Sequence, residues 1–375
     1  MNFWQQLPTP FFTVAPMADV TDAPFRRLIA KYSSYDRIPP HTKGGFILPL
    51  SQKVGGPDVM WTEFVSADGL LRATPEGKQK LLADLIYTEA ERPIVAQLFS
   101  STEAHMEAAA ALCLELGFDG VDINMGCPDR SIEKQGCGAA MIKTPDIARA
   151  IIRAAKRGAR HGEVGGIPVS VKTRVGYNHD AIDTWIPELL AEAPAALTVH
   201  ARTRQELSQV PADWERIARV VALRDSLAPQ TRVIGNGDVL SAADGHLKAN
   251  LSGADGVMVG RALFGNPWFF HPTRRLPTRL TALPTHGVNR DTIITTDTSD
   301  TAVEYISLTD RLQVLLEHTE LFVELLPFKN FAVMKKHYKA YVSGFPGAAD
   351  LRGRLMEAPD VHAVRQIVTS YIETL

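Results

Sequence analysis

The chain has 375 residues, of which 45% are hydrophobic and 22% are charged, values that exclude a disordered or fibrous protein. Its 40 basic and 42 acidic residues nearly cancel, which excludes a histone-like polycation but leaves room for a local basic face. Three cysteines are too few and odd in number for a disulfide scaffold, which favours a reducing compartment. Neither a signal peptide nor a membrane-spanning apolar run is recognisable, so we expect a soluble, cytoplasmic protein without membrane contacts.

Eight short apolar segments rich in β-branched residues recur along the first two thirds of the chain. In chain order, these predicted strands cover residues 13–17, 62–65, 94–98, 120–124, 168–173, 196–200, 232–236 and 256–260. Helix-like segments lie between most of them, as at 103–117, 145–158 and 213–224. This alternation predicts a parallel sheet closed into a (β/α)8 TIM barrel. A doubly wound open sheet is less favoured, because no Gly-x-Gly-x-x-Gly motif follows the first strand.

Two segments interrupt this pattern, and a third changes it. Residues 33–60 contain Pro-Pro and two Gly-Gly pairs, which predicts a long surface insertion within a barrel domain that covers residues 1–270. Residues 271–303 are rich in Thr, Asp and Pro, which is typical of a linker or loop. Residues 304–375 carry four helical segments with short connections, which predicts a C-terminal all-α bundle domain.

Polar residues and glycines close the predicted strands with a regularity that packing does not readily explain. The carboxyl ends of the strands form the active-site face of such a barrel. The residues at these ends are Pro16, Met17, Glu63, Gln97, Asn124, Lys172, His200, Asn236, Gly237, Gly260 and Arg261. A ring of this composition could hold a planar, hydrogen-bonding, phosphorylated cofactor.

The last two strand ends predict a phosphate site. The turn at residues 235–238 follows the seventh strand, and Gly260 and Arg261 follow the eighth. These two loops commonly hold phosphate in this fold, because glycines let backbone N–H groups approach the oxygens and arginine can add a bidentate contact. The alternative is that the glycines only make tight turns. Their occurrence at both expected strands favours phosphate.

Three other strand-end side chains permit two interpretations each. Lys172 could stabilise negative charge on a reduced flavin ring. Alternatively, its aliphatic stem could lie along the strand end and place the ammonium in solvent. His200 could contact a ligand, although an isolated histidine is more often structural. Gln97 could hydrogen-bond the edge of a heterocycle or only cap its strand.

The most specific local feature is the turn at residues 124–128, just after the fourth predicted strand. A thiol presented there by Cys127 can act as a nucleophile or as a general acid. The alternative is a small buried hydrophobic residue, the common state of a free cysteine. Cys113 fits that alternative, and we interpret Cys137 as incidental, with a redox role as the minority view. No cysteine–histidine spacing suits zinc, and we expect no metal.

The ordered set of motifs resembles the tRNA-dihydrouridine synthases, flavin enzymes that reduce selected uridines in tRNA. The matching segments are APM at 15–17, TEFVSA at 62–67, AQLF at 96–99, DINMGCP at 122–128, VKTR at 171–174, HARTR at 200–204, GNGD at 235–238 and MVGR at 258–261. Residues 335–341 in the C-terminal segment also resemble the helical domain of that family.

The resemblance implies an FMN-dependent reaction in which NADPH, or NADH, reduces the flavin. The residues it implies for FMN binding are Pro16, Met17, Gln97, Lys172, His200, Asn236, Gly237, Asp238, Gly260 and Arg261. Uracil would receive a hydride at C6 from the flavin and a proton at C5 from Cys127. Asn124 and Arg202 would contact the substrate, and the uridine would have to be extruded from the tRNA stack to reach the site.

A basic cluster in the C-terminal segment predicts where tRNA docks. It contains Lys335, Lys336 and Lys339 at helical spacing, with Lys329, Arg352 and Arg354 nearby in sequence. The alternative is an ordinary solvated helix face. We expect a monomer.

Other functions remain open from sequence alone. They are another FMN-dependent barrel oxidoreductase acting on a small molecule, such as a dihydroorotate dehydrogenase or an ene-reductase, a tRNA-binding protein without catalysis, and a phosphosugar-binding barrel without flavin.

Overall fold

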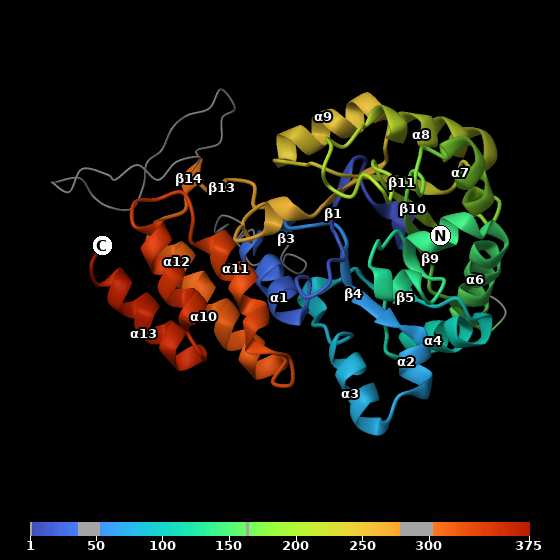
Figure 1. Cartoon of the computed structure of the whole chain (residues 1–375). Coiled ribbons are helices and arrows are strands. Elements are labelled where there is room, and N and C mark those ends of the chain that lie inside the picture. The colour runs from blue at the N-terminus through green and yellow to red at the C-terminus, as the bar shows by residue number, and fades with distance from the viewer. Residues whose placement is uncertain (1, 37–52, 163–164, 278–302) are drawn as a thin grey trace, which may run out of the picture. The chain divides into compact units, whose positions relative to one another are not determined.

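One parallel sheet of eight strands is the main sheet of the structure, a computed structural model that describes residues 2–36, 53–162, 165–277 and 303–375 (Figure 1). The strands are β1 (Phe11–Val14), β4 (Met60–Ser66), β5 (Ile94–Phe99), β6 (Gly120–Met125), β9 (Val169–Arg174), β10 (Ala196–His200), β11 (Arg232–Asn236) and β12 (Gly256–Val259). Their order in the sheet is β1-β12-β11-β10-β9-β6-β5-β4. Each of the eight predicted strands is confirmed.

The two outer strands of this order meet and close the sheet. Thr13 of β1 and Val59, next to β4, form a parallel bridge. Val14 N–H donates to the Val59 carbonyl at 3.1 Å, and Asp58 N–H donates to the Phe12 carbonyl at 2.7 Å. Closure removes both exposed sheet edges, so the predicted (β/α)8 barrel is confirmed.

Helices follow most of the barrel strands. They are α2 (Ala67–Arg72), α3 (Pro75–Ala83), α4 (Glu103–Glu115), α5 (Arg130–Glu133), α6 (Pro145–Gly158), α7 (Ile182–Leu190), α8 (Glu215–Leu227) and α9 (Ala242–Ser252). The three helices predicted at 103–117, 145–158 and 213–224 correspond to α4, α6 and α8. Helix α6 begins with Pro145 in its first turn, where the missing N–H costs nothing.

An apolar cluster fills the interior of the barrel below its carboxyl-terminal mouth. Its buried members come from almost every strand: Phe11, Ala15, Val59, Trp61, Val95, Ala196, Ile234 and Met258, with Trp4 from the 3-10 helix η1 (Phe3–Gln6). Because side chains on a strand alternate between faces, residues two positions later on the same strands also point inward, one layer higher. That higher layer contains Glu63, Gln97 and Asn236.

By packing, the chain divides into two compact units. The barrel unit comprises residues 1–23 and 57–261, and the helical unit comprises residues 24–56 and 262–375. The helical unit therefore includes most of α1 (Ala23–Tyr32), which follows the first barrel strand in sequence. This division lies close to the domain boundary predicted at residue 270 but assigns residues 24–56 differently.

The two interrupting segments are described in part. In the first, β2 (Ser34–Asp36) pairs antiparallel with β3 (Lys53–Gly55), and residues 37–52 lie outside the described residues. In the second, β13 (Arg274–Arg275) pairs in parallel with β14 (Glu304–Tyr305), and residues 278–302 lie outside. A further short pair, β7 (Arg160–His161) and β8 (Gly165–Gly166), follows α6.

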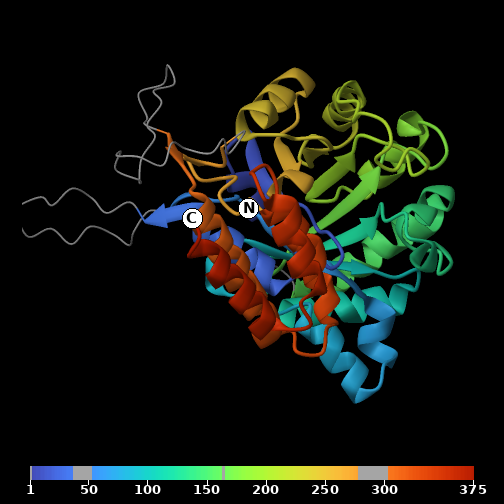
Figure 2. The same ribbon diagram turned by 60° about the vertical axis from the view of Figure 1, so that its left-hand side comes forward.

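The four predicted C-terminal helices are confirmed. They are α10 (Leu308–Leu325), α11 (Met334–Tyr341), α12 (Ala348–Glu357) and α13 (Val361–Ile372), and α10 and α13 lie side by side (Figures 1 and 2). Helix α11 is shorter than its sequence pattern, because Asn330 caps the separate 3-10 turn η5 (Phe331–Val333) before it. In the described part of the chain, no helix has both the length and the apolar character required to cross a bilayer.

Candidate active site

The strand register brings predicted residues together at the mouth of the barrel. Asn124 of β6 lies beside Lys172 of β9, and His200 of β10 lies beside Asn236 of β11. In the same way, Gln97 of β5 lies beside Asp122 of β6. Neighbouring residues in register point to the same face, so these side chains converge on one site.

Cys127 stands on a turn that is held from two sides. The Asn124 side-chain oxygen accepts hydrogen bonds from the N–H groups of Gly126 at 3.1 Å and Cys127 at 2.9 Å. From the other side, Arg174 Nε–H donates to the Gly126 carbonyl at 2.8 Å, and Ala139 N–H donates to the Cys127 carbonyl at 2.9 Å. The thiol-bearing side chain is half-buried and packs against an apolar cluster of Phe99, Ile132 and Cys137.

Burial raises the pKa of the Cys127 thiol, and the nearby charge of Asp129 acts in the same direction. The thiol therefore keeps its proton at neutral pH, which suits a proton donor better than a nucleophilic thiolate. Burial also raises the pKa of Cys113 to about 12 and that of Cys137 to about 11. Both are buried, as a structural role requires.

Asn124 continues into a chain of side-chain hydrogen bonds. Its Nδ2–H donates to Gln97 Oε1 at 3.0 Å, and Gln97 Nε2–H donates to Asp122 Oδ2 at 2.7 Å. Ser170 Oγ–H donates to the other oxygen of Asp122 at 2.6 Å. Burial raises the pKa of Asp122 to about 6, against the opposing effects of Ser170, Gln97 and the charge of Lys172.

The sequence prediction missed Asp122, Ser170 and Arg174. The signal that could have found them is strand alternation: Asp122 precedes Asn124 by two residues, and Ser170 and Arg174 flank Lys172 at the same spacing. Such residues share a face with a predicted site residue.

Lys172 is a half-buried cation, and within the described residues its ammonium makes one weak hydrogen bond, to Asn236 Oδ1 at 3.4 Å. Asn236 is fixed in turn by donating from Nδ2 to the Met258 carbonyl at 2.9 Å. Burial, assisted by the charge of Arg174, lowers the pKa of Lys172 to about 8. A cation held in this way is suited to an anionic or strongly polar ligand.

His200 is neutral, and its tautomer follows from its neighbour. Arg202 Nη1 lies 3.1 Å from His200 Nε2, and since a guanidinium only donates, Nε2 must accept. The ring proton is therefore on Nδ1. Burial and the charges of Arg174 and Lys172 lower the pKa of His200 well below its usual value.

Arg202 itself is only 2% exposed, and its guanidinium is engaged within the barrel. Besides His200, it donates to the Val210 carbonyl at 2.6 Å and pairs with Asp238. Asp238 also accepts from Ala212 N–H at 2.8 Å and pairs with the exposed Arg261. Burial alone would raise the pKa of Asp238, but these partners outweigh it and lower that pKa.

Two glycines at the barrel mouth differ in whether the backbone around them tolerates a side chain. Gly237 has φ +131°, and a Cβ there would lie 2.6 Å from the Ala212 Cβ, so the backbone path itself needs glycine. A Cβ on Gly260 would lie 3.5 Å from Met17 Sδ and 3.6 Å from the Ala15 Cβ, which are ordinary contacts. The protein alone therefore leaves room at Gly260 for another group.

Pro16 and Met17 lie directly after β1 and are half-buried. Met17 N–H donates to Thr21 Oγ1 at 2.8 Å, and its carbonyl accepts from Thr21 N–H at 3.0 Å. These bonds form a tight turn that keeps the Met17 side chain against the barrel cluster.

The predicted docking residues Lys335, Lys336 and Lys339 lie on α11 of the helical unit. The buried face of this helix carries Met334, His337, Tyr338 and Tyr341, whereas Lys339 is exposed and Lys335 and Lys336 are half-buried. The lysines thus lie outside the buried stripe of α11.

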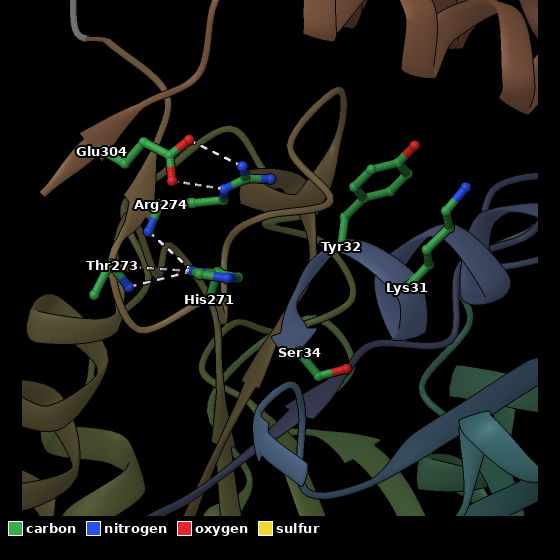
Figure 3. Close-up of a pocket in the computed structure, with 7 residues that line it drawn as sticks. All are labelled: Lys31, Tyr32, Ser34, His271, Thr273, Arg274 and Glu304. Atoms are coloured by element: carbon green, nitrogen blue, oxygen red, sulfur yellow. Dashed lines mark hydrogen bonds and ion pairs between the residues drawn. The ribbon is translucent and has the colours of Figure 1, made fainter. Parts of the chain in front are cut away.

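The helical unit also has an open hollow of about 470 Å³ (Figure 3). It is lined by Lys31, Tyr32, Ser34, His271, Thr273, Arg274 and Glu304. Arg274 forms a two-bond ion pair with Glu304, both at 2.9 Å, and Lys31 pairs with Glu317 at 2.7 Å. The positive charges of Arg274 and Lys31 are thus each balanced by a carboxylate. Within the described residues, no cluster of His, Cys, Asp or Glu is suited to a metal ion.

Comparison with known proteins gives concordant results. "Probable tRNA-dihydrouridine synthase 2" of Bacillus subtilis (strain 168) is 33% identical over 371 residues, which cover 99% of this chain and 96% of that protein. "Probable tRNA-dihydrouridine synthase" of Staphylococcus aureus (strain COL) is 32% identical over 373 residues, covering 99% and 95%. A solved structure of a morphinone reductase mutant aligns with 69% of this chain and 85% of that chain at 11% identity, with a TM-score of 0.44, a likeness too weak to indicate function.

The family model described as "Dihydrouridine synthase (Dus)" matches residues 13–373, nearly the whole chain. The match includes every strand of the barrel except the first two residues of β1, and all four C-terminal helices. The chain therefore belongs to the dihydrouridine synthase family.

Proposed function

We propose that the barrel mouth reduces the C5–C6 double bond of uridine in tRNA, with Cys127 as the proton donor. Family membership makes the protein an oxidoreductase of this class, and the names of its relatives support tRNA as the substrate. The observation that carries the residue assignment is the half-buried Cys127 thiol, protonated at neutral pH and fixed by Asn124 and Arg174.

The residues of the mouth fit a flavin mononucleotide. Gly260 leaves room for a further group, and we propose that the phosphate cradle is formed there by the 235–238 turn and by Arg261, which pairs with Asp238 of that turn. Lys172, with its weak bond to Asn236, can approach the polar edge of the ring, and neutral His200 can donate from Nδ1. Pro16, Met17, Gln97, Asn236, Gly237 and Asp238 complete the proposed flavin site.

When bound, the reduced flavin supplies the hydride that C6 of uracil receives, and NADPH, or NADH, is the proposed reductant. The chain's own contribution is the proton: the Cys127 S–H bond breaks as a C–H bond forms at C5. The hydride and the proton together saturate the double bond, so the reaction balances. The turn around Cys127 keeps the thiol oriented during this step.

Asn124 and Arg202 have less freedom toward substrate than their sequence positions imply. Asn124 Oδ1 already accepts two backbone N–H groups, so we propose that only the second proton of Nδ2 remains for the base. Arg202 is buried, so we propose that it acts by fixing His200 and Asp238.

Docking of tRNA is proposed for the basic residues of α11. Replacing Lys335, Lys336 and Lys339 together by alanine is expected to weaken tRNA binding by about 10–100-fold at low salt and to reduce the slope of log K against log salt by about 2. Filter binding across a salt series measures both. The control is Lys78→Ala with Lys80→Ala, two exposed lysines of α3. An unchanged slope in the triple variant would remove α11 from the docking surface.

Alanine substitutions at the two mouth glycines are expected to have different effects, one on flavin binding and the other on the stability of the fold. Gly260→Ala is expected to leave the stability of the flavin-free protein unchanged and to weaken flavin binding by roughly tenfold or more, because the new methyl group occupies the proposed phosphate cradle. Gly237→Ala is expected to destabilise the fold by about 1–3 kcal/mol, because its φ and the Ala212 contact both resist a side chain. Thermal unfolding and flavin fluorescence titration distinguish the two. Wild-type flavin affinity in Gly260→Ala would refute the cradle.

The function itself is tested by expression in cells that lack their own uridine-reducing enzymes. Mass spectrometry of the tRNA is expected to show dihydrouridine restored at one or more positions, and the purified protein is expected to be yellow. Absence of restored dihydrouridine from a folded, flavin-loaded protein would contradict the proposal. The same samples, analysed by light scattering, test the further proposal that the protein is a monomer.

A further inference from the structure

The hydrogen bonds between Cys127 and Asp122 have a defined direction. An amide side chain has one accepting end and one donating end, so its orientation is fixed when a neighbour can only donate or only accept. The backbone N–H groups of Gly126 and Cys127 only donate, so Asn124 presents Oδ1 to them and Nδ2 to Gln97. Gln97 must then present Oε1 to Asn124 and Nε2 to its other neighbour.

That other neighbour is Asp122, and an ionised carboxylate only accepts. The relay of Asp122, Gln97 and Asn124 is therefore consistent in direction along its whole length, at 2.7, 3.0 and 2.9 Å. Asp122 and Gln97 are both 0% exposed, so neither is open to bulk solvent. If the carboxylate were absent, Gln97 Nε2 would lose its acceptor, and the restraint that Gln97 places on the Asn124 side chain would weaken.

We propose that Asp122 is a positioning residue for Cys127: its carboxylate matches the donating end of Gln97 and so anchors the relay that holds the Cys127 turn. This inference rests on the proposed role of Cys127 as proton donor. Asp122 does not reach the reacting atoms itself; it acts through Gln97 and Asn124.

Burying an ionised carboxylate costs free energy, and the neighbours of Asp122 offset part of that cost. Across the strands, Ser170 of β9 donates to Asp122 Oδ1 at 2.6 Å, and the Lys172 ammonium, also on β9, and the Trp61 side chain of β4 favour its ionised form. Burial nevertheless raises its pKa to about 6, so the carboxylate is ionised at neutral pH. A residue needed only for packing would be apolar at this position.

The test compares two replacements of the same side chain. Asp122→Leu removes the acceptor, whereas Asp122→Asn keeps an oxygen for Gln97 and loses only the charge. In Asp122→Leu, amide hydrogen exchange at Gly126 and Cys127 is expected to accelerate about tenfold or more, and kcat for dihydrouridine formation to fall about 10–100-fold with an unchanged KM for tRNA. Asp122→Asn is expected to stay within about threefold of the wild type in both measurements.

The control for general loosening is Asp255→Asn, a buried carboxylate at the opposite end of the barrel. It accepts from Arg232 at 3.0 Å and from Val233 N–H at 2.8 Å, far along the strands from the mouth. Its replacement is expected to lower the unfolding temperature while the Gly126 and Cys127 amides keep wild-type exchange.

Each outcome supports or overturns the proposal. Wild-type exchange at Gly126 and Cys127 in Asp122→Leu would overturn it, and so would an Asp122→Asn variant as impaired as Asp122→Leu, since charge rather than direction would then matter. If Asp122→Leu does not fold, Gln97→Met decides in its place: it removes the middle of the relay, and unchanged exchange there would overturn the proposal. A wild-type protein that makes no dihydrouridine but shows the expected exchange pattern would refute the proposed function and leave the relay supported.

Discussion

Replacing Cys127 by alanine is expected to lower dihydrouridine formation by about 10²–10⁴-fold, the contribution of a positioned proton donor. Flavin binding and reduction of the flavin by NADPH are expected to persist, because the Asn124 and Arg174 side chains bind backbone atoms of this turn, the Cys127 N–H and the Gly126 carbonyl, which alanine at 127 retains. Rapid mixing separates these steps: flavin bleaching by NADPH in the absence of tRNA, then flavin reoxidation when tRNA is added in the absence of oxygen. Only the second step is expected to slow.

The matched control is Cys113→Ala, a cysteine fully buried on α4. It is expected to reoxidise with tRNA at the wild-type rate. The pH dependence adds a second readout. Because burial raises the Cys127 pKa, the wild-type rate is expected to hold to a higher pH than an ordinary cysteine would permit and then to fall as the thiol loses its proton. An alkaline limb that persists unchanged in Cys127→Ala would assign the proton to another group.

Replacing Lys172 by methionine is expected to have opposite effects on stability and on cofactor binding. The Lys172 pKa is about 8 in the folded protein, whereas the ordinary value for lysine is 10.5, so below pH 8 the fold holds a half-buried ammonium that the unfolded chain solvates better. Lys172→Met is therefore expected to stabilise the flavin-free protein at pH 7 by up to about 3 kcal/mol. The gain is expected to shrink as pH rises from 8 toward 10.5, because folded Lys172 is then already neutral.

With flavin present, the same substitution is expected to weaken binding by roughly 10–100-fold, since it removes the cation proposed to face the ring. Urea denaturation at pH 7 and pH 10, with and without flavin, measures both effects. Lys156→Met is the control for flavin affinity: burial also lowers the pKa of Lys156, but it binds the Ala193 carbonyl at 3.0 Å, away from the strand ends that form the mouth. Lys172→Met protein that binds flavin as tightly as the wild type would show that this ammonium does not contact the cofactor.

The strands of the barrel could be predicted from sequence because their signal is local. Each is a short β-branched run, and each observed strand overlaps its predicted range. The mouth residues were predictable for a related reason: carboxyl ends of parallel strands meet at one face, so chain order alone assembles Gln97, Asn124, Lys172 and His200.

What the sequence could not supply is the register between strands. Asp122 matters because it lies between Gln97 on one neighbouring strand and Ser170 on the other, and no local pattern reveals such pairs. Arg202 is a second example. Its position after a strand end predicts an accessible cation, yet its guanidinium is buried and bound to the Val210 carbonyl and Asp238. The membership of α1 in the helical unit depends on contacts with residues more than 200 positions away, such as Lys31 with Glu317.

The contact between Arg202 and His200 has a further consequence for interpreting kinetics. An imidazole whose Nε2 lone pair is already occupied by a guanidinium cannot readily take up a second proton, so it remains an invariant donor through the acid and neutral range. If a plot of rate against pH shows an inflection near neutrality, we do not expect it to come from the His200 ring, although histidine is the side chain that usually titrates in that range. We expect such inflections to come from the Asp122 carboxyl, with a pKa of about 6, and the Lys172 ammonium, with a pKa of about 8.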